Sequence, residues 1–291
     1  GIETTTGPLG QGIANAVGIA IAETILSERF NQEKFNIIDH FTYVFAGDGC
    51  LMEGVSHEAA SLAGTLKLGK LIAIWDDNNI SIDGKTDGWF TDNTADRFKA
   101  YGWHVVANVD GHDSVQIEEA LLQAKANTTQ PSIICCKTKI GYGSDKVAGL
   151  AKAHGAPLGK EEVAACKRNL DWPSTEPFII PESILQAWRE KAPCKDAYYS
   201  WHNMLLEYQT AHPDLFTSLT DFIAGKLPGQ FESAIYNSLD FSKAMSTRQC
   251  SGAVIEELAK VLPNLIGGSA DLTGSNCTNW TTMQTYRPNK P

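Results

Sequence analysis

The sequence predicts an α/β fold with a mostly parallel sheet and helices on both of its faces. Segments typical of strands alternate with segments typical of helices through the first half of the chain, which is the pattern of a parallel sheet. Residues 71–75 are apolar throughout, as expected of a strand buried on both faces. Two apolar runs end at Gly-Asp-Gly and at Asp-Asp-Asn-Asn, and such strand ends are where open α/β sheets place their ligands.

The expected elements follow from local patterns in chain order. A turn-rich opening contains three glycines and a proline within residues 7–12, which lets the backbone approach another group closely. A helix is expected at 12–30, because isoleucine or valine recurs there every four residues. The same criteria predict strands at 41–46, 71–75, 80–82, 103–109 and 132–137. They predict helices at 55–66, 93–101 and 115–127.

The second half of the chain has a different pattern. Six prolines punctuate short helical stretches between 159 and about 239, so a helical connecting segment is expected there. A helix at 253–262 followed by a strand at 264–269 predicts the start of a second α/β unit. We therefore expect three parts, which are a first domain at 1–158, a helical linker at 159–241 and a truncated second domain at 242–291.

Composition excludes several classes of protein. The chain has 291 residues and a formal net charge of −10, which argues against a nucleic-acid or anionic-membrane binder. No apolar run reaches the ~18 residues of a membrane span. Seven cysteines without a CxxC spacing favour a reducing compartment, and the chain shows no signal-peptide pattern. A cytoplasmic protein is expected.

Three familiar motifs fail on context. Residues 64–70 match GxxxxGK, but Leu71 replaces the Mg²⁺-binding Ser or Thr of a phosphate-binding loop. Met52 holds the position of the last glycine in a dinucleotide-binding GxGxxG. His57 and Glu58 are not followed by the second histidine of a zinc-binding HExxH.

The remaining signal is Gly47-Asp48-Gly49 paired with Asn78-Asn79. Both follow the carboxyl ends of expected strands, and the glycines let backbone N–H groups reach phosphate oxygens. A carboxylate, an amide oxygen and a backbone carbonyl are hard ligands suited to Mg²⁺ or Ca²⁺. Residues 1–150 hold 11 basic and 19 acidic side chains, net −8, so a metal would neutralise a bound diphosphate there without Lys or Arg.

Longer blocks of sequence extend this signal. They are ETTTGPLGQG at 3–12, GDGCLMEGVSHEAASLAGTLKLGKL at 47–71, HGAPLG at 154–159 and GGSADL at 267–272. Together they resemble transketolases along essentially the whole chain. The resemblance implies the thiamine diphosphate-binding fold, with residues 1–158 as a diphosphate- and metal-binding domain and 242–291 as the start of a pyrimidine-binding domain.

The resemblance also implies roles at the cofactor. Asp48, Asn78 and the backbone carbonyl of Ile80 would bind Mg²⁺, with Ca²⁺ as the alternative metal, and Asn78 would also count as a cofactor contact. Gly49 would donate to the diphosphate and Ile82 would pack on the thiazolium. The residues that would line the thiamine are Gly7, Pro8 and Leu9.

Further roles concern the substrate and the subunit interface. His154 would contact both the diphosphate and the donor sugar, a role that suits a switchable donor. Arg248 and Ser275 match residues that bind the substrate phosphate, and Arg is well shaped for phosphate. Asp271 matches an aspartate that reaches the cofactor of the partner subunit. Glu53, like Glu58, resembles glutamates that support the catalytic machinery at the dimer interface.

The implied function is a transferase of the pentose phosphate pathway. It would move a two-carbon ketol group from a ketose phosphate such as xylulose 5-phosphate to an aldose phosphate such as ribose 5-phosphate. It would work as a homodimer with its active site between subunits. A whole transketolase also has a longer amino-terminal segment and a complete pyrimidine-binding domain. We therefore expect this chain to be an internal fragment that is inactive alone.

Other assignments stay open. Dihydroxyacetone synthase and 1-deoxyxylulose-5-phosphate synthase are related thiamine enzymes, and HGAPLG with GDGCLMEG favours transketolase over the latter. A different class of function is a non-catalytic chain that binds thiamine diphosphate as one subunit of a split enzyme.

Overall fold

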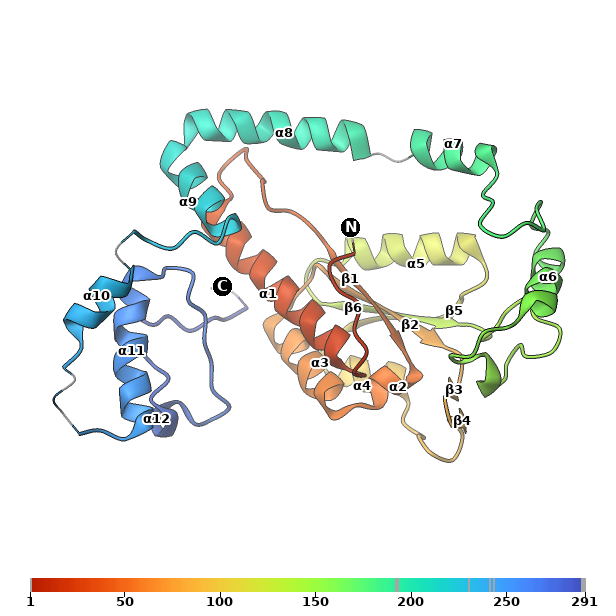
Figure 1. The fold of residues 1–291 in the computed structure, drawn as a ribbon, viewed down its shortest axis with the longest axis horizontal. Helices are drawn as coiled ribbons and strands as arrows, with labels where there is room; N and C mark the ends of the chain where they lie inside the picture. Colours follow the sequence, from red (N-terminus) through yellow and green to blue (C-terminus); the bar gives the residue numbers. More distant parts are fainter. Residues whose placement is uncertain (1, 192–193, 230, 241, 243, 289–291) are drawn as a thin grey trace. The chain divides into compact units, whose positions relative to one another are not determined.

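The structure is a computed structural model that describes residues 2–191, 194–229, 231–240, 242 and 244–288 (Figure 1). The chain forms two compact units, one that reaches Trp201 and a second that comprises His202–Arg287. The boundary falls within helix α8 (Cys194–Ala211). The three-part division at 158 and 241 stays a prediction.

The first unit is built on a four-stranded parallel sheet, which confirms the predicted fold class (Figure 1). The strands lie in the order β1 (Thr42–Gly47), β2 (Leu71–Asp77), β6 (Ser132–Lys137) and β5 (His104–Asp110). Every neighbouring pair in this sheet is parallel. All four carboxyl ends therefore lie at one edge.

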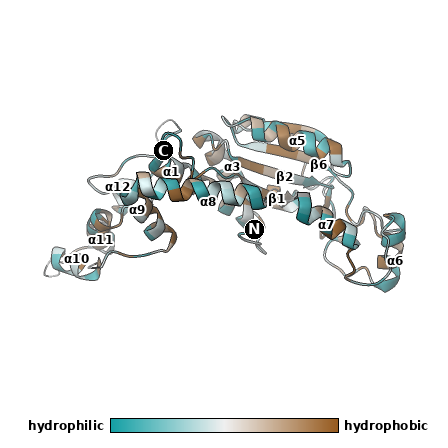
Figure 2. Cartoon of the chain, turned by 90° about the horizontal axis from the view of Figure 1, so that it is seen from above, coloured by the Kyte–Doolittle hydropathy of each residue, from teal (hydrophilic) through white to brown (hydrophobic). Residues whose placement is uncertain are grey.

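Helices cover the sheet on both faces and create two hydrophobic cores. One core joins alternate strand residues such as Leu71, Ala73 and Ile133 to helices α1 (Gln11–Phe30), α3 (Gly54–Leu66) and α4 (Thr94–Ala100). The other joins Ile72 and Ile134 to α5 (Ser114–Ala126). In Figure 2, α5 lies on the opposite side of the sheet from α1. The continuous apolar run predicted at 71–75 is thus explained by helices on both faces of β2. In β1, by contrast, Tyr43 and Phe45 are exposed and only the alternate residues are buried.

Short elements occupy the carboxyl edge between the main strands and helices. Helix α2 (Asp48–Met52) begins directly after β1, where the sequence predicts only a turn. After β2, strands β3 (Ile80–Ser81) and β4 (Gly84–Lys85) form a small antiparallel pair, which confirms the short strand predicted near 80–82. A helix of five residues is too short to produce a periodic apolar pattern, so the sequence does not show it.

Beyond β6 the described chain is helical. The first unit continues through η1 (Ala151–Ala153), α6 (Lys160–Asn169) and α7 (Glu182–Lys191). The second unit contains α9 (Pro213–Ile223), α10 (Phe231–Ser238), α11 (Thr247–Val261) and α12 (Thr273–Asn276). The helical character predicted for 159–239 is confirmed.

The predicted strand at 264–269 is wrong, because these residues are irregular. A strand is defined by hydrogen bonds to a neighbouring strand, and the described residues of this unit provide no neighbour. The composition of the segment suggested a strand, but it could not supply the partner that a strand needs.

Candidate functional site at the carboxyl edge of the sheet

The register of the sheet brings the two sequence signals together. Gly47, the last residue of β1, pairs with Asp76 on β2. Asp48 therefore lies one residue beyond this pair and Asn78 two residues beyond it, at the same edge. The expectation that Gly-Asp-Gly and Asn-Asn share one site is supported by this pairing.

Asp48 is buried with an unsatisfied oxygen. It is the first residue of α2 and is 8 % exposed, and its Oδ2 has no hydrogen-bond partner among the described residues. Burial raises the pKa of this carboxyl and the nearby charge of Asp77 raises it further, while the backbone N–H groups of Asn79 and Asn78 act in the opposite direction. A buried carboxylate oxygen without a partner is costly, and a cation beside it would remove that cost. The site therefore fits a metal ion.

Asn78 sits in a sharp turn that directs polar atoms toward the strand end. Its Oδ1 accepts a hydrogen bond from the Ile80 N–H at 2.9 Å, and its Nδ2 donates to Asp76 Oδ2 at 3.1 Å. Asn79 has φ of 59°, a left-handed conformation that asparagine tolerates better than most residues. The turn thus holds the side-chain amide of Asn78 against the backbone N–H of Ile80.

The neighbouring aspartates are held by structural contacts. Asp77 is buried and forms an ion pair with Lys137 on β6, while Asp76 accepts a hydrogen bond from the Thr138 hydroxyl. These contacts join the end of β2 to the last residue of β6 and to the residue that follows it. Among the described residues, no group of three or more His, Cys, Asp or Glu is arranged to hold a metal. The predicted set differs from such a group, because it contains one carboxylate together with an amide oxygen and a backbone carbonyl.

The glycine-rich opening lies beside the Gly-Asp-Gly turn. A Cβ atom added to Gly49 would come 3.2 Å from Leu9 Cδ1, so these residues are neighbours although forty positions apart. Gly10 has φ of 82°, and a Cβ there would meet Val55 Cγ1 at 2.6 Å. Gly10 is therefore required for the loop to pack against the start of α3. Gly7, Pro8 and Leu9 are exposed beside it.

Two other predicted residues of the first unit are exposed near this edge. Ile82 follows β3 with 74 % of its surface exposed, and Glu53 is exposed immediately before α3. The apolar side chain of Ile82 is thus not part of a hydrophobic core and is available to a ligand.

His154 lies in a segment anchored by a buried glutamate. It ends η1 and is exposed. Glu162 on α6 is 5 % exposed and accepts hydrogen bonds from Ser144 Oγ at 2.5 Å and the Lys146 N–H at 2.9 Å. These bonds lower the pKa of Glu162, with that from Ser144 as the largest cause. The segment from 144 to α6 is thereby closed into a loop.

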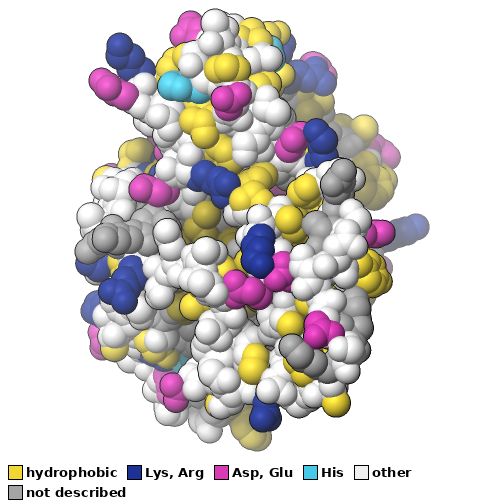
Figure 3. Space-filling view, turned by 90° about the vertical axis from the view of Figure 1, so that its left-hand side faces the viewer, with side chains coloured by type: hydrophobic (Ala, Val, Ile, Leu, Met, Phe, Trp, Pro, Cys, Tyr) yellow, Lys and Arg dark blue, Asp and Glu magenta, His cyan; other side chains and the backbone are white. Residues whose placement is uncertain are grey.

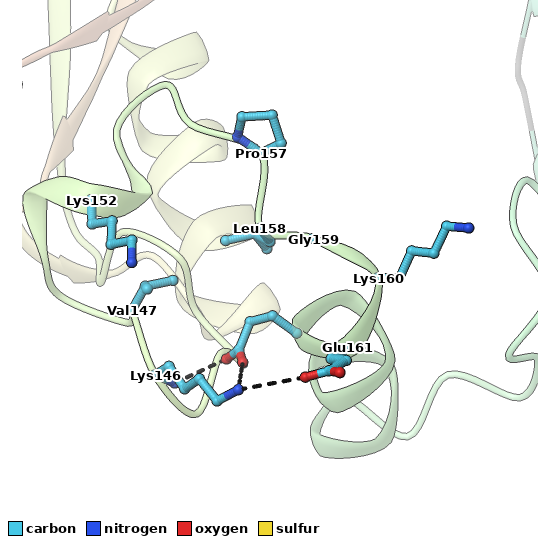
Figure 4. Close-up of a pocket in the computed structure, with 9 residues that line it drawn as sticks. Lys146, Val147, Lys152, Pro157, Leu158, Gly159, Lys160 and Glu161 are labelled. Carbon is cyan, nitrogen blue, oxygen red and sulfur yellow. Dashed lines mark hydrogen bonds and ion pairs between the residues drawn. The ribbon is translucent and has the colours of Figure 1, made fainter.

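A cavity of about 410 Å³ borders this loop, and none of the predicted metal ligands lines it. In Figure 4, the ammonium of Lys146 is directed toward Glu161, whereas Lys160 points away. The lining also includes Lys152, Pro157 and Leu158. His154 and the predicted metal ligands are not among the lining residues, so this cavity is separate from the candidate site.

Three predicted residues lie in the second unit. Arg248 is in the first turn of α11, Ser275 is in α12 and Asp271 precedes α12 with φ of 60°; all three are exposed. A Cβ on Gly252 would lie 2.8 Å from the Cβ of Cys277, so α11 and the end of α12 pack closely. The roles of these residues toward a substrate stay predictions.

Sequence reasoning missed one residue beside the candidate site. Arg97 on α4 donates to the backbone carbonyl of Leu51 in α2. The sequence offers no signal for this contact. From the sequence, Arg97 and Asp92 suggest only an ordinary ion pair on the surface.

The charges on the described surface relate to the argument against a nucleic-acid or anionic-membrane binder. On the face drawn in Figure 3, acidic and basic side chains are scattered among one another, without a broad basic patch on its described residues. No helix of the described residues combines the length and apolar composition of a membrane span.

Fold and site together define an α/β protein with a candidate ligand site at the carboxyl edge of a parallel sheet. Residues 1–228 match the family described as "Transketolase, thiamine diphosphate binding domain". The chain belongs to this transketolase family, which binds thiamine diphosphate through this domain.

Individual relatives agree. The chain is 52 % identical to transketolase 2 of Escherichia coli strain K12 over 284 residues, covering 96 % of this chain and 42 % of the relative. It is 52 % identical to transketolase 1 of Pasteurella multocida over 291 residues, covering 99 % and 43 %. The chain thus spans about two fifths of the length of these relatives.

Solved structures confirm the fold. A Pichia stipitis transketolase in complex with sedoheptulose 7-phosphate superimposes with a TM-score of 0.92 at 41 % identity, covering 99 % of this chain and 43 % of that one. A transketolase from Leishmania mexicana superimposes with a TM-score of 0.90 at 43 % identity, covering 96 % and 41 %.

Proposed function

We propose that the protein carrying this chain transfers a two-carbon ketol unit from a ketose phosphate to an aldose phosphate, as a thiamine diphosphate-dependent transketolase. The observation that carries the proposal is Asp48, a buried carboxylate with an unpartnered oxygen beside the Asn78 turn. Membership of the transketolase family and a sugar-phosphate complex of a similar structure support the reaction class.

The metal site consists of Asp48, the side-chain oxygen of Asn78 and the backbone carbonyl of Ile80. These are hard oxygen ligands, which suit Mg²⁺ and also Ca²⁺. Asn78 Oδ1 already accepts one hydrogen bond from the Ile80 N–H. Because an amide oxygen has two lone pairs, it can keep that hydrogen bond while it binds a cation.

The chain's contribution to the cofactor is positioning. Gly49, at the start of α2, donates its N–H to the diphosphate, with Asn78 close by. Gly7, Pro8 and Leu9 line the thiamine and Ile82 covers the thiazolium with its exposed apolar side chain. Thiamine diphosphate supplies the nucleophilic carbon and the electron sink for cleavage of the ketose. The protein residues hold it in place and exclude water from it.

The substrate end completes the proposal. His154 donates hydrogen bonds to the diphosphate and to the donor sugar, while Arg248 and Ser275 bind the substrate phosphate. Asp271 reaches the cofactor of the other subunit and Glu53 supports the interface, in a cytoplasmic homodimer of the pentose phosphate pathway. The proposed domains are residues 1–158, 159–241 and 242–291.

A coupled assay with xylulose 5-phosphate and ribose 5-phosphate tests the reaction. The native protein is expected to convert these two sugar phosphates in the presence of thiamine diphosphate and Mg²⁺. The 291-residue chain alone is expected to be inactive. Turnover by the isolated chain would contradict the second expectation. Formaldehyde as the preferred acceptor would favour dihydroxyacetone synthase, and pyruvate as the preferred donor would favour 1-deoxyxylulose-5-phosphate synthase. An inactive native protein that binds the cofactor would indicate a non-catalytic subunit.

Asp48→Ala tests the metal assignment. Loss of the carboxylate removes the one charged ligand of the set, so Mg²⁺-dependent binding of thiamine diphosphate should disappear. Isothermal titration calorimetry of the native protein and the variant measures this directly. Unchanged affinity in Asp48→Ala would refute the assignment.

A further inference from the structure

Helix α2 carries Asp48 and Gly49 but cannot sustain itself. It has five residues, and isolated helices shorter than about 12–15 residues are marginal in water. Its last carbonyls lack partners within the helix and receive them from outside. Ser56 Oγ donates to the Cys50 carbonyl at 2.5 Å, and Arg97 Nη2 donates to the Leu51 carbonyl at 3.0 Å. The orientation of α2 therefore depends on these two side chains.

Arg97 is itself held in place on several sides. Its side chain is 12 % exposed, and its Nη1 lies 2.8 Å from Asp92 Oδ2. Its guanidinium carbon lies 5.2 Å from the centroid of the Phe90 ring, within the range of a cation–π contact. A mostly buried arginine with three different contacts is unlike a mobile surface charge, and its position is fixed by the segment that precedes α4.

That segment leads back to the second half of the candidate metal site. The Phe90 N–H donates to the Thr86 carbonyl at 3.0 Å, and the Thr86 N–H donates to the Asn79 carbonyl at 3.1 Å. Asn79 lies between Asn78 and Ile80. Arg97 is thus joined through Leu51 to the helix of Asp48, and through Phe90 and Thr86 to the turn of Asn78.

We propose that Arg97 is a positioning residue that sets the separation between Asp48 and the Asn78–Ile80 turn. The proposal rests on the metal site proposed above. The planar guanidinium bonds Leu51 and Asp92 at once, in fixed directions. A lysine ammonium at the same position could replace the charge but not the fixed geometry.

The test compares variants of the native protein by the Mg²⁺ concentration that gives half-saturation of thiamine diphosphate binding. Arg97→Met should raise this concentration on the order of 10–100-fold, as loss of groups that orient metal ligands does elsewhere. Arg97→Lys and Asp92→Asn should have intermediate effects. Saturating Mg²⁺ should restore cofactor binding in each. Lys99→Met is the control, since Lys99 lies on the same helix with 60 % exposure and pairs with Asp96.

The outcomes separate the two proposals. Absence of metal-dependent binding in the wild type would refute the metal site itself. Normal binding in the wild type with unchanged half-saturation in Arg97→Lys and Asp92→Asn would overturn the role of Arg97, even where Arg97→Met fails to fold. In a third outcome, saturating Mg²⁺ does not restore cofactor binding in the Arg97 variants, and their melting temperature without cofactor is also lower than that of the wild type. That result would assign Arg97 to stability alone.

Discussion

At the scale of the residue, Asp48 shows how a site can oppose the stability of its own fold. The carboxyl is buried near Asp77, and both effects raise its pKa. A group whose pKa is higher in the folded state stabilises the fold when protonated, and this contribution is lost as the pH rises through the folded-state value. At neutral pH the charged carboxylate therefore destabilises the fold until a cation binds.

Asp48→Asn should raise the melting temperature of the 291-residue chain in the absence of metal and at neutral pH. The amide removes the buried charge while keeping the shape of the side chain. A gain of about 1 kcal/mol would correspond to about 2–4 °C. Differential scanning calorimetry with chelator measures the change, and Asp87→Asn is the control because Asp87 is exposed. A lower melting temperature in Asp48→Asn would show that the carboxylate stabilises the fold.

At the scale of the element, two helical glycines have opposite surroundings. A Cβ on Gly64 in α3 would lie 1.7 Å from the backbone carbonyl oxygen of Tyr101, whereas nothing lies within 4 Å of a Cβ on Gly18 in α1. Gly64 therefore permits a close approach of α3 to the end of α4. Gly18 only adds conformational freedom to an exposed helix position.

Gly64→Ala and Gly18→Ala should change stability in opposite directions. Forcing a methyl group against the backbone at Gly64 should lower the free energy of unfolding by about 1–3 kcal/mol or more. Alanine at Gly18 should raise it by about 0.5–1 kcal/mol. Urea titration followed by circular dichroism gives both values. Equal effects of the two substitutions would contradict the packing of α3 against Tyr101.

At the scale of the whole molecule, acid stability depends on how the long segment after the sheet is fastened. Glu162 joins Ser144 and Lys146 to α6, and these bonds lower its pKa. A carboxyl with a lowered pKa contributes stability above its ordinary value of 4.5. The contribution is lost as the pH falls through the lower folded-state value.

In Glu162→Gln, the free energy of unfolding should therefore fall less steeply with decreasing pH below about pH 4.5 than in the wild type. Thermal unfolding of the chain between pH 3 and 7 measures this dependence. Glu161→Gln is a matched control, because the Glu161 side chain is 95 % exposed and its ion pair to Lys146 Nζ is long at 4.0 Å. A slope in Glu162→Gln as steep as in the wild type would show that the loop is held by other contacts.

Prediction from sequence succeeded for elements with an apolar run or a periodic pattern that extends over several consecutive residues. The four main strands and helices α1, α3, α4 and α5 follow from apolar runs and periodicity, because each buries a continuous face. It failed for 264–269, whose apolar composition suggests a strand but which has no neighbouring strand in the described residues. It also failed for α2, whose existence depends on side chains elsewhere in the chain.

The sequence by itself determined the parallel α/β unit, the Gly-Asp-Gly and Asn-Asn signals at its edge and the family to which they belong. Only the tertiary structure decided that Asp48 has an unpartnered oxygen, that Leu9 lies against Gly49 and that Arg97 joins α2 to the Asn78 turn. The reason is physical. The tendency to form a helix or a strand is set by patterns among neighbouring residues, whereas the burial of Asp48 and the contacts of Leu9 and Arg97 depend on segments some forty positions apart.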